Sequence, residues 1–195
     1  MPPADHPASR SGPHAGTHAG PVAGPVAGIA RAPLAELVTI LLEPGADLYG
    51  GLLEGLADAG ARRATVVSGI GALQRTTARN VRHPVEVFPI RDADRAFVTV
   101  PGPCEIVSLT GWLAPFASGE PHLHLHFAAS YVERDESGDA VRLIGGHLSP
   151  GACRAYVHVA VTFAVHGEVD GRPDAAYLFD DALQVERLSV PAAEG

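Results

Sequence analysis

Short apolar runs separated by Pro/Gly-rich or polar turns fill most of the chain after residue 33, a pattern that is typical of β-strands. We expect strands over residues 37–42, 65–70, 76–81, 96–100, 105–112, 122–132, 141–147 and 155–166. Helical spacing occurs at one place between these runs. Repeated βαβ units are therefore not supported, and most strands should pair antiparallel with a neighbour.

The helical segment begins behind Asp47, a favourable N-cap residue, and ends before Gly60, a typical stop signal. Its leucines recur every four residues at Leu48, Leu52 and Leu56. Glycines within it lower its intrinsic stability, so we expect packing to hold it. The sequence thus predicts an α+β fold: a single domain with a large mixed, mostly antiparallel β-sheet and one main helix packed on it.

The two ends of the chain differ from its middle. Residues 1–30 are rich in Pro, Gly and Ala and cannot hold a helix or a sheet ladder, so we interpret them as a disordered tail. Residues 31–195 then form the folded domain. Residues 183–190 alternate apolar and charged side chains and fit either an edge strand or a short helix.

Charge and composition exclude several classes of protein. The formal net charge is −8 and every one of the 14 basic residues is Arg, which excludes a globally basic nucleic-acid binder. The 2 cysteines are too few for a disulfide framework and fit buried thiols in a reducing compartment. No apolar run approaches the roughly 18–20 residues that span a bilayer, and no secretory signal is recognisable. We expect a cytoplasmic protein that does not contact a membrane.

Histidine and apolar residues alternate strictly between His122 and Phe127. On a strand, His122, His124 and His126 share one face, and the apolar residues share the other. Neighbours on one face lie roughly 6–7 Å apart, so two imidazoles can bind one metal ion at about 2.0–2.1 Å each.

A fourth histidine can reach this face through a β-hairpin. A turn centred near residues 136–137 places His147 opposite His126, and a shift by two residues places it opposite His124 or Ala128. A register shifted by one residue would turn the side chain of His147 to the opposite face of the sheet. Three histidines with an open fourth position fit a catalytic-type zinc centre, or another divalent metal, and the spacing leaves open which of the four bind. The two glycines before His147 suit close approach of a backbone or a ligand.

Four short motifs occur in a characteristic order: Gly69–Leu73 (GIGAL), Glu105–Gly111 (EIVSLTG), His124-x-His126 and Gly145–Leu148 (GGHL). In this order they resemble the "plants and prokaryotes conserved" domain, also called PPC or DUF296, over about residues 34–166. The resemblance implies an α+β domain that forms homotrimers. It also implies a metal ion, expected to be zinc, on His124, His126 and His147. His122 stands where the family often has an apolar residue, which implies a neighbouring or spare role.

The resemblance also implies DNA binding or regulation, because plant members carry an AT-hook for AT-rich DNA and prokaryotic members are commonly labelled DNA-binding. An AT-hook needs an Arg-Gly-Arg-Pro core, whereas residues 171–173 supply only Gly-Arg-Pro between two aspartates. The acidic net charge also removes most of the favourable free energy that counterion release contributes to DNA binding, which disfavours DNA as a partner. Arg75, Arg79 and Arg82 remain a candidate local patch.

An enzyme is the alternative. Alpha-acetolactate decarboxylase is similar in architecture and also holds zinc with three histidines, which suggests metal-dependent decarboxylase or lyase chemistry on a small carboxylated or oxygenated metabolite. Glu105 and Arg79 are candidates by residue type only, and the sequence assigns no catalytic acid or base. A structural metal that pins the hairpin at a trimer interface is the third possibility.

Overall fold

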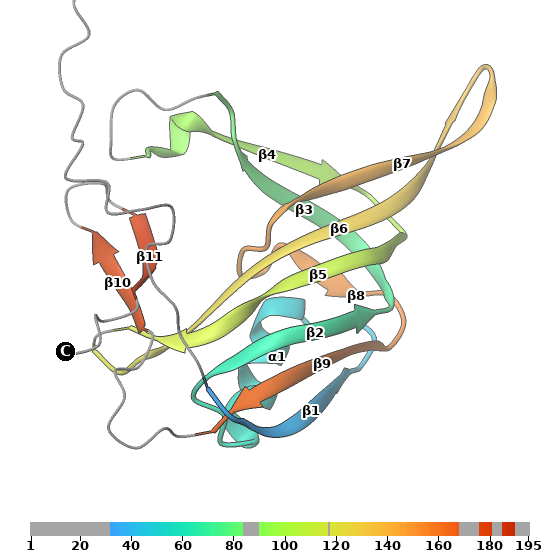
Figure 1. Ribbon diagram of the computed structural model, residues 1–195. Coiled ribbons are helices and arrows are strands. Elements are labelled where there is room, and N and C mark those ends of the chain that lie inside the picture. Colours follow the sequence, from blue (N-terminus) through green and yellow to red (C-terminus); the bar gives the residue numbers. More distant parts are fainter. Residues whose placement is uncertain (1–31, 84–89, 117, 168–175, 181–184, 190–195) are drawn as a thin grey trace, which may run out of the picture.

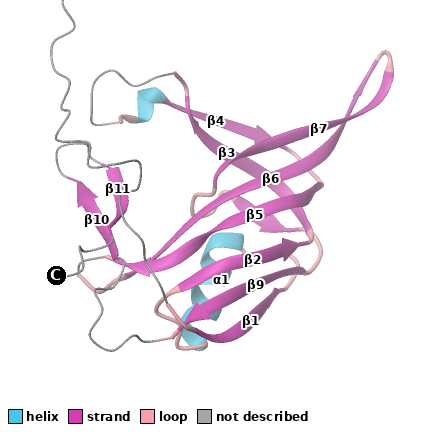
Figure 2. Cartoon of the chain, viewed as in Figure 1, coloured by secondary structure: helices cyan, strands magenta, loops and turns pink. Residues whose placement is uncertain are grey.

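β-strands dominate the structure (Figure 2). The computed structural model describes residues 32–83, 90–116, 118–167, 176–180 and 185–189. One sheet contains β1 (Leu34–Leu42), β2 (Ala64–Ile70), β3 (Ala72–Val81), β4 (Arg95–Val100), β5 (Cys104–Pro115), β6 (Pro121–Asp135), β7 (Gly138–His147), β8 (Cys153–Ala155) and β9 (Val159–His166). The helices of the described residues are α1 (Leu48–Asp58) and a short 3₁₀ helix, η1 (Asp92–Asp94). The pairings of this sheet are antiparallel, so the predicted α+β class is confirmed.

The large sheet is curved, so that strands distant from each other in its order also pair. Its order is β1–β9–β2–β5–β6–β7–β3–β4, and β3 also pairs with β5 and β8. The pairings of β5 with β6, β6 with β7, β7 with β3 and β3 with β5 therefore form a closed circuit (Figure 1). Such a circuit has an interior that side chains fill and an outer face, between which residues alternate along each strand.

Helix α1 packs closely on β1. The carboxylate of Asp47 caps the helix by accepting a hydrogen bond from the amide of Gly50 at 2.8 Å. Three leucines, four residues apart, are fully buried on one helical face: Leu48, Leu52 and Leu56. A Cβ at Gly55 would lie 2.9 Å from Cγ2 of Ile40, so glycine lets the helix approach the sheet. This packing offsets the low helix propensity of glycine.

Strand β6 has the two distinct faces that its alternation predicts. Leu123, Leu125 and Phe127 are buried. His124 is half-buried and His126 is exposed on the opposite face. Each fully buried side chain of this size contributes about 1.5–3 kcal/mol. A shift of one residue would exchange the two faces, so burial of the apolar face determines where the histidines point.

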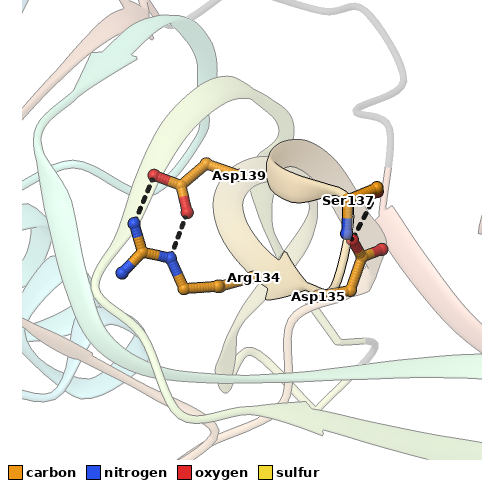
Figure 3. A network of polar contacts seen from close by, with 4 residues as sticks. All are labelled: Arg134, Asp135, Ser137 and Asp139. Carbon is orange, nitrogen blue, oxygen red and sulfur yellow. Dashed lines mark hydrogen bonds and ion pairs between the residues drawn. The ribbon is translucent and has the colours of Figure 1, made fainter.

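The β6–β7 hairpin determines which residue of β7 lies beside each histidine. Its two-residue turn at 136–137 is supported by Asp135, whose carboxylate accepts hydrogen bonds from the amide and the hydroxyl of Ser137 (Figure 3). Across the strands, Nε of Arg134 donates to Oδ1 of Asp139 at 2.7 Å. Exposed ion pairs contribute at most about 1 kcal/mol. The length of the turn therefore matters more for the register.

One predicted strand is wrong as a continuous element. Residues 155–166 are split between β8 and β9, and Tyr156 and Val157 between them are 53% and 46% exposed. The physical reason is a change of partner, because β8 pairs with β3 whereas β9 lies between β1 and β2. Regular alternation of buried and half-buried residues holds only from Val159 onward.

Residues 1–30, predicted to be a tail, and residues 171–173, the partial AT-hook, lie outside the described residues. Residues 185–189 form β11 (Val185–Ser189), which pairs with β10 (Ala176–Asp180) in a separate two-stranded sheet. Of the two alternatives for this segment, the strand is thus confirmed, although it is not an edge of the large sheet. The described part of the chain has no helix that is long and apolar enough to cross a membrane.

Candidate metal centre

Three strands align His126, His147 and Arg79 in one row across the sheet. The Cα of His126 on β6 lies opposite that of His147 on β7, and His147 lies opposite Arg79 on β3. Directly opposed residues of an antiparallel pair project from the same face. The register predicted from the turn at residues 136–137 is therefore confirmed.

The imidazoles of His124, His126 and His147 converge on this face. Nε2 of His124 lies 3.2 Å from Nε2 of His126, and the two rings are stacked. The ring of His147 stands nearly perpendicular to both, with centroids 4.9 Å from His124 and 5.3 Å from His126. One nitrogen from each residue lies within 4.8 Å of the others. Three donors thus surround one point, which is the arrangement that a shared ion requires.

The chemistry of these donors fits a divalent cation. A metal-bound imidazole must be neutral. Burial, and after it the positive charge of Arg79, lowers the pKa of His147 from 6.5 to about 3. The same two causes lower the pKa of His126. Tetrahedral bonds of about 2.1 Å place ligand nitrogens roughly 3.4 Å apart, close to the 3.2 Å between His124 and His126.

Aromatic side chains extend this face beyond the three histidines. Trp112 on β5 is the Cα partner of His124, and the two rings stack with centroids 5.8 Å apart. Sequence patterns alone do not place Trp112 beside His124, because this contact depends on the register of β5 against β6. His122 lies against Phe116 instead, with ring centroids 4.6 Å apart. It is not part of the three-histidine cluster found among the described residues.

Of the two charged candidates named from residue type, only Arg79 lies beside the histidines. Its charge acts on both His126 and His147. Glu105 lies on β5 opposite Ser130, which is four positions along β6 from His126. At the usual rise per residue this is roughly 13 Å along the strand. Glu105 is therefore not a group of this site.

Gly146 allows β3 to approach β7 beside His147. Its φ is +156°, and a Cβ there would lie 2.7 Å from the carbonyl oxygen of Arg79. Next to it, Nδ2 of Asn80 donates to the carbonyl oxygen of Gly145 at 2.8 Å. Of the two uses suggested for these glycines, close approach of a backbone is the one that the structure supports.

Comparison with protein families gives one match. Residues 30–166 match the family described as the Plants and Prokaryotes Conserved (PCC) domain. This range contains both strands of the hairpin and all three clustered histidines. No curated protein matches the chain.

Solved structures share the fold at low sequence identity. A metal-containing protein from Archaeoglobus fulgidus aligns with a TM-score of 0.59 and 20% identity, over 83% of this chain and 99% of that chain. A plant- and prokaryote-conserved (PPC) protein from Pyrococcus horikoshii aligns with a TM-score of 0.54 and 18% identity, over 82% and 96%. A candidate DNA-binding protein from Bacteroides thetaiotaomicron aligns with a TM-score of 0.59 and 15% identity, over 80% and 94%. At these identities the likeness establishes the fold alone.

The lowered pKa of His147 predicts how stability depends on pH in the metal-free protein. In the unfolded chain His147 becomes protonated as the pH falls below 6.5. In the folded chain the same imidazole stays neutral until the pH reaches about 3. The contribution of His147 to the free energy of unfolding is therefore complete above pH 6.5 and is lost as the pH falls toward 3. Urea unfolding at a series of pH values should give a shallower dependence for His147→Gln than for wild type. Equal slopes would contradict the lowered pKa.

Proposed function

Because the chain belongs to the Plants and Prokaryotes Conserved (PCC) domain family, we propose that it is a metal-binding member of that family. In this proposal His124, His126 and His147 bind one divalent ion, zinc, through one ring nitrogen each. The observation that carries it is the convergence of these nitrogens within 4.8 Å on one face of the sheet. The lowered pKa values of His126 and His147 support it, because both imidazoles are neutral at pH 7.

The cluster, as far as the described residues go, offers three ligands and no fourth. A tetrahedral ion bound there keeps a position for water or a ligand, which is the pattern of catalytic rather than structural zinc. Zinc in such a site supplies a Lewis acid that polarises a bound oxygen. The protein's own residues orient the ion: β6 fixes two imidazoles by burying its other face, and β7 supplies the third.

A metal-dependent enzyme of the decarboxylase or lyase kind is the alternative to a regulatory role. The architectural similarity to alpha-acetolactate decarboxylase stays a prediction.

We also propose that the chain forms a homotrimer in the cytoplasm. Support for an assembly comes from apolar side chains on the surface of β1, where Leu37 and Leu41 are each 60% exposed. They alternate with the buried Ile40 and Leu42, so they lie on the sheet face that turns away from α1. The unpaired, buried Cys104 and Cys153 fit a reducing compartment.

DNA binding is a second candidate function, favoured by the fold neighbours that are described as candidate DNA-binding proteins. The candidate basic patch is still that of Arg75, Arg79 and Arg82, of which Arg75 and Arg79 lie on β3. The charge of the protein argues against DNA binding, because the net charge is −8 and, among the described residues, three arginines form ion pairs with carboxylates. These three are Arg95, Arg134 and Arg142.

Replacing one ligand tests the metal site. Gently purified wild type should contain about one zinc ion per chain, and His126→Ala should contain almost none, because two imidazoles alone hold zinc weakly. The matched control is His122→Ala, which removes a histidine from the same strand and face but not from the cluster. Mass spectrometry of metals, with light scattering for the mass of the oligomer, measures both. Unchanged zinc in His126→Ala would exclude this ligand set.

A salt titration tests the DNA candidate. Under this candidate, an AT-rich duplex should bind at about 50 mM salt and be released as salt rises, because phosphate contacts depend on counterion release. Arg75→Gln should weaken the binding. Fluorescence anisotropy of a labelled duplex measures it, and absence of binding at the lowest salt would eliminate this function.

A further inference from the structure

The end of the β6–β7 hairpin extends beyond the rest of the sheet. Strand β5 pairs with β6 only as far as Ser130, and β3 pairs with β7 only at His147. Among the described residues, the segments 131–135 and 138–142 therefore pair with each other alone, and Figure 1 shows them projecting from the body of the domain. We call residues 131–142 the arm. A two-stranded hairpin by itself is only marginally stable in water, so a contact with another surface would stabilise the arm.

One face of the arm is apolar and the other is polar. Val132 and Val141 are Cα partners and both are exposed, Val141 at 73%. Leu143, at the base of the arm, lies two residues from Val141 on the same face and is also exposed. On the opposite face, Nε of Arg142 donates to Oε2 of Glu133 at 2.9 Å. The three large apolar side chains, which we call the arm patch, thus face solvent together.

A second exposed apolar surface lies at the β1 edge of the large sheet. Leu41 on β1 and Ile70 on β2 are both Cα partners of Ala160 on β9, so the three side chains project from one face. Leu37 lies on the same face, four residues from Leu41. Leu37, Leu41 and Ile70 are all exposed, and we call them the β1–β2 patch. Monomeric proteins rarely expose large apolar patches, so these two surfaces indicate a partner.

The arm does not cover the β1–β2 patch of its own molecule. Strands β1 and β7 are separated by four other strands in the order of the sheet. Figure 1 shows the arm pointing away from β1. We propose that the arm patch of one copy of this chain packs on the β1–β2 patch of a second copy. This inference rests on the proposed homotrimer and names the surfaces that build it.

The symmetry of the contact favours a second copy as the occupant. The two patches are different surfaces, so a contact between them is heterologous, and every copy offers one of each. Heterologous contacts repeat head to tail, and a closed ring of three copies buries every patch in the assembly. A contact between two arm patches would pair the copies about a two-fold axis and leave the β1–β2 patch exposed. Neither patch contains a charged residue, which fits the core of an interface between identical chains.

Two single substitutions at exposed positions test the proposal. Val141→Lys places a charge in the arm patch, and Leu41→Lys places one in the β1–β2 patch. Light scattering of the full chain during gel filtration, over a dilution series, measures the mass of the assembly. We expect wild type to be a trimer. Each variant should raise the concentration of half-dissociation at least about 10-fold, because the interface then loses the burial of a large apolar side chain.

The matched control is Val98→Lys. It makes the same change at an exposed valine of β4, which belongs to neither patch, and should leave the trimer intact. If Val141→Lys does not fold, Val141→Thr decides, because threonine keeps the β-branched shape of valine and replaces a methyl group with a hydroxyl. It should weaken the trimer, and an unchanged trimer would overturn the role of the arm.

Cross-linking between introduced cysteines tests the head-to-tail direction. A chain that carries both Leu41→Cys and Val141→Cys should give covalent trimers with a short bis-maleimide, because each arm lies on the β1–β2 patch of the next copy. The native Cys104 and Cys153 are buried and should react slowly. Either substitution alone should give no covalent dimer. Dimers from one single variant would show that identical patches meet, which would overturn the inference.

The mass of wild type separates this inference from the proposed function. Wild type that is not a trimer would contradict the proposed homotrimer and, with it, this inference. A wild-type trimer that only one of Val141→Lys and Leu41→Lys weakens, or that neither weakens, would overturn this inference alone. Zinc is measured in the same samples, and its absence from wild type would contradict the proposed metal site without touching the contact between the patches.

Discussion

The pairing of β6 with β7 is the constraint on which the candidate site depends. It places His147 directly opposite His126, and a slip of one residue would turn every side chain of one strand to the other face. Two features oppose such a slip. The turn at residues 136–137 determines which residues of β6 and β7 lie opposite each other. Leu125 and Phe127 are buried, which keeps the apolar face of β6 in the hydrophobic core. The site is therefore stabilised mainly by side chains that point away from it.

The closed circuit of strands adds a charge to this geometry. Because β3 pairs with β7 on the side opposite to β6, Arg79 continues the row that His126 and His147 begin. Burial and this arginine act in the same direction, since both disfavour protonated histidine. Neutral imidazoles are the form that binds a metal ion, so both effects favour the form of His126 and His147 that a ligand needs.

The sequence predicted the parts of the site that local patterns determine. Alternation along residues 122–127 and a short turn were enough to bring His147 to His126. It did not predict that Trp112 stacks on His124 or that Arg79 lies opposite His147, because these contacts depend on pairings between strands that are distant in the chain. It also missed the break between β8 and β9, where the chain changes partners without a strong turn signal. Long-range register, rather than residue type, was the missing information.

The most direct test of the central claim is a crystal structure of the zinc-loaded wild-type chain, with diffraction measured on both sides of the zinc absorption edge. We expect one anomalous peak per chain at about 2.0–2.1 Å from one nitrogen of each of His124, His126 and His147. A peak at any other place, or one in which His122 replaces one of the three, would contradict the site that the β6–β7 register builds.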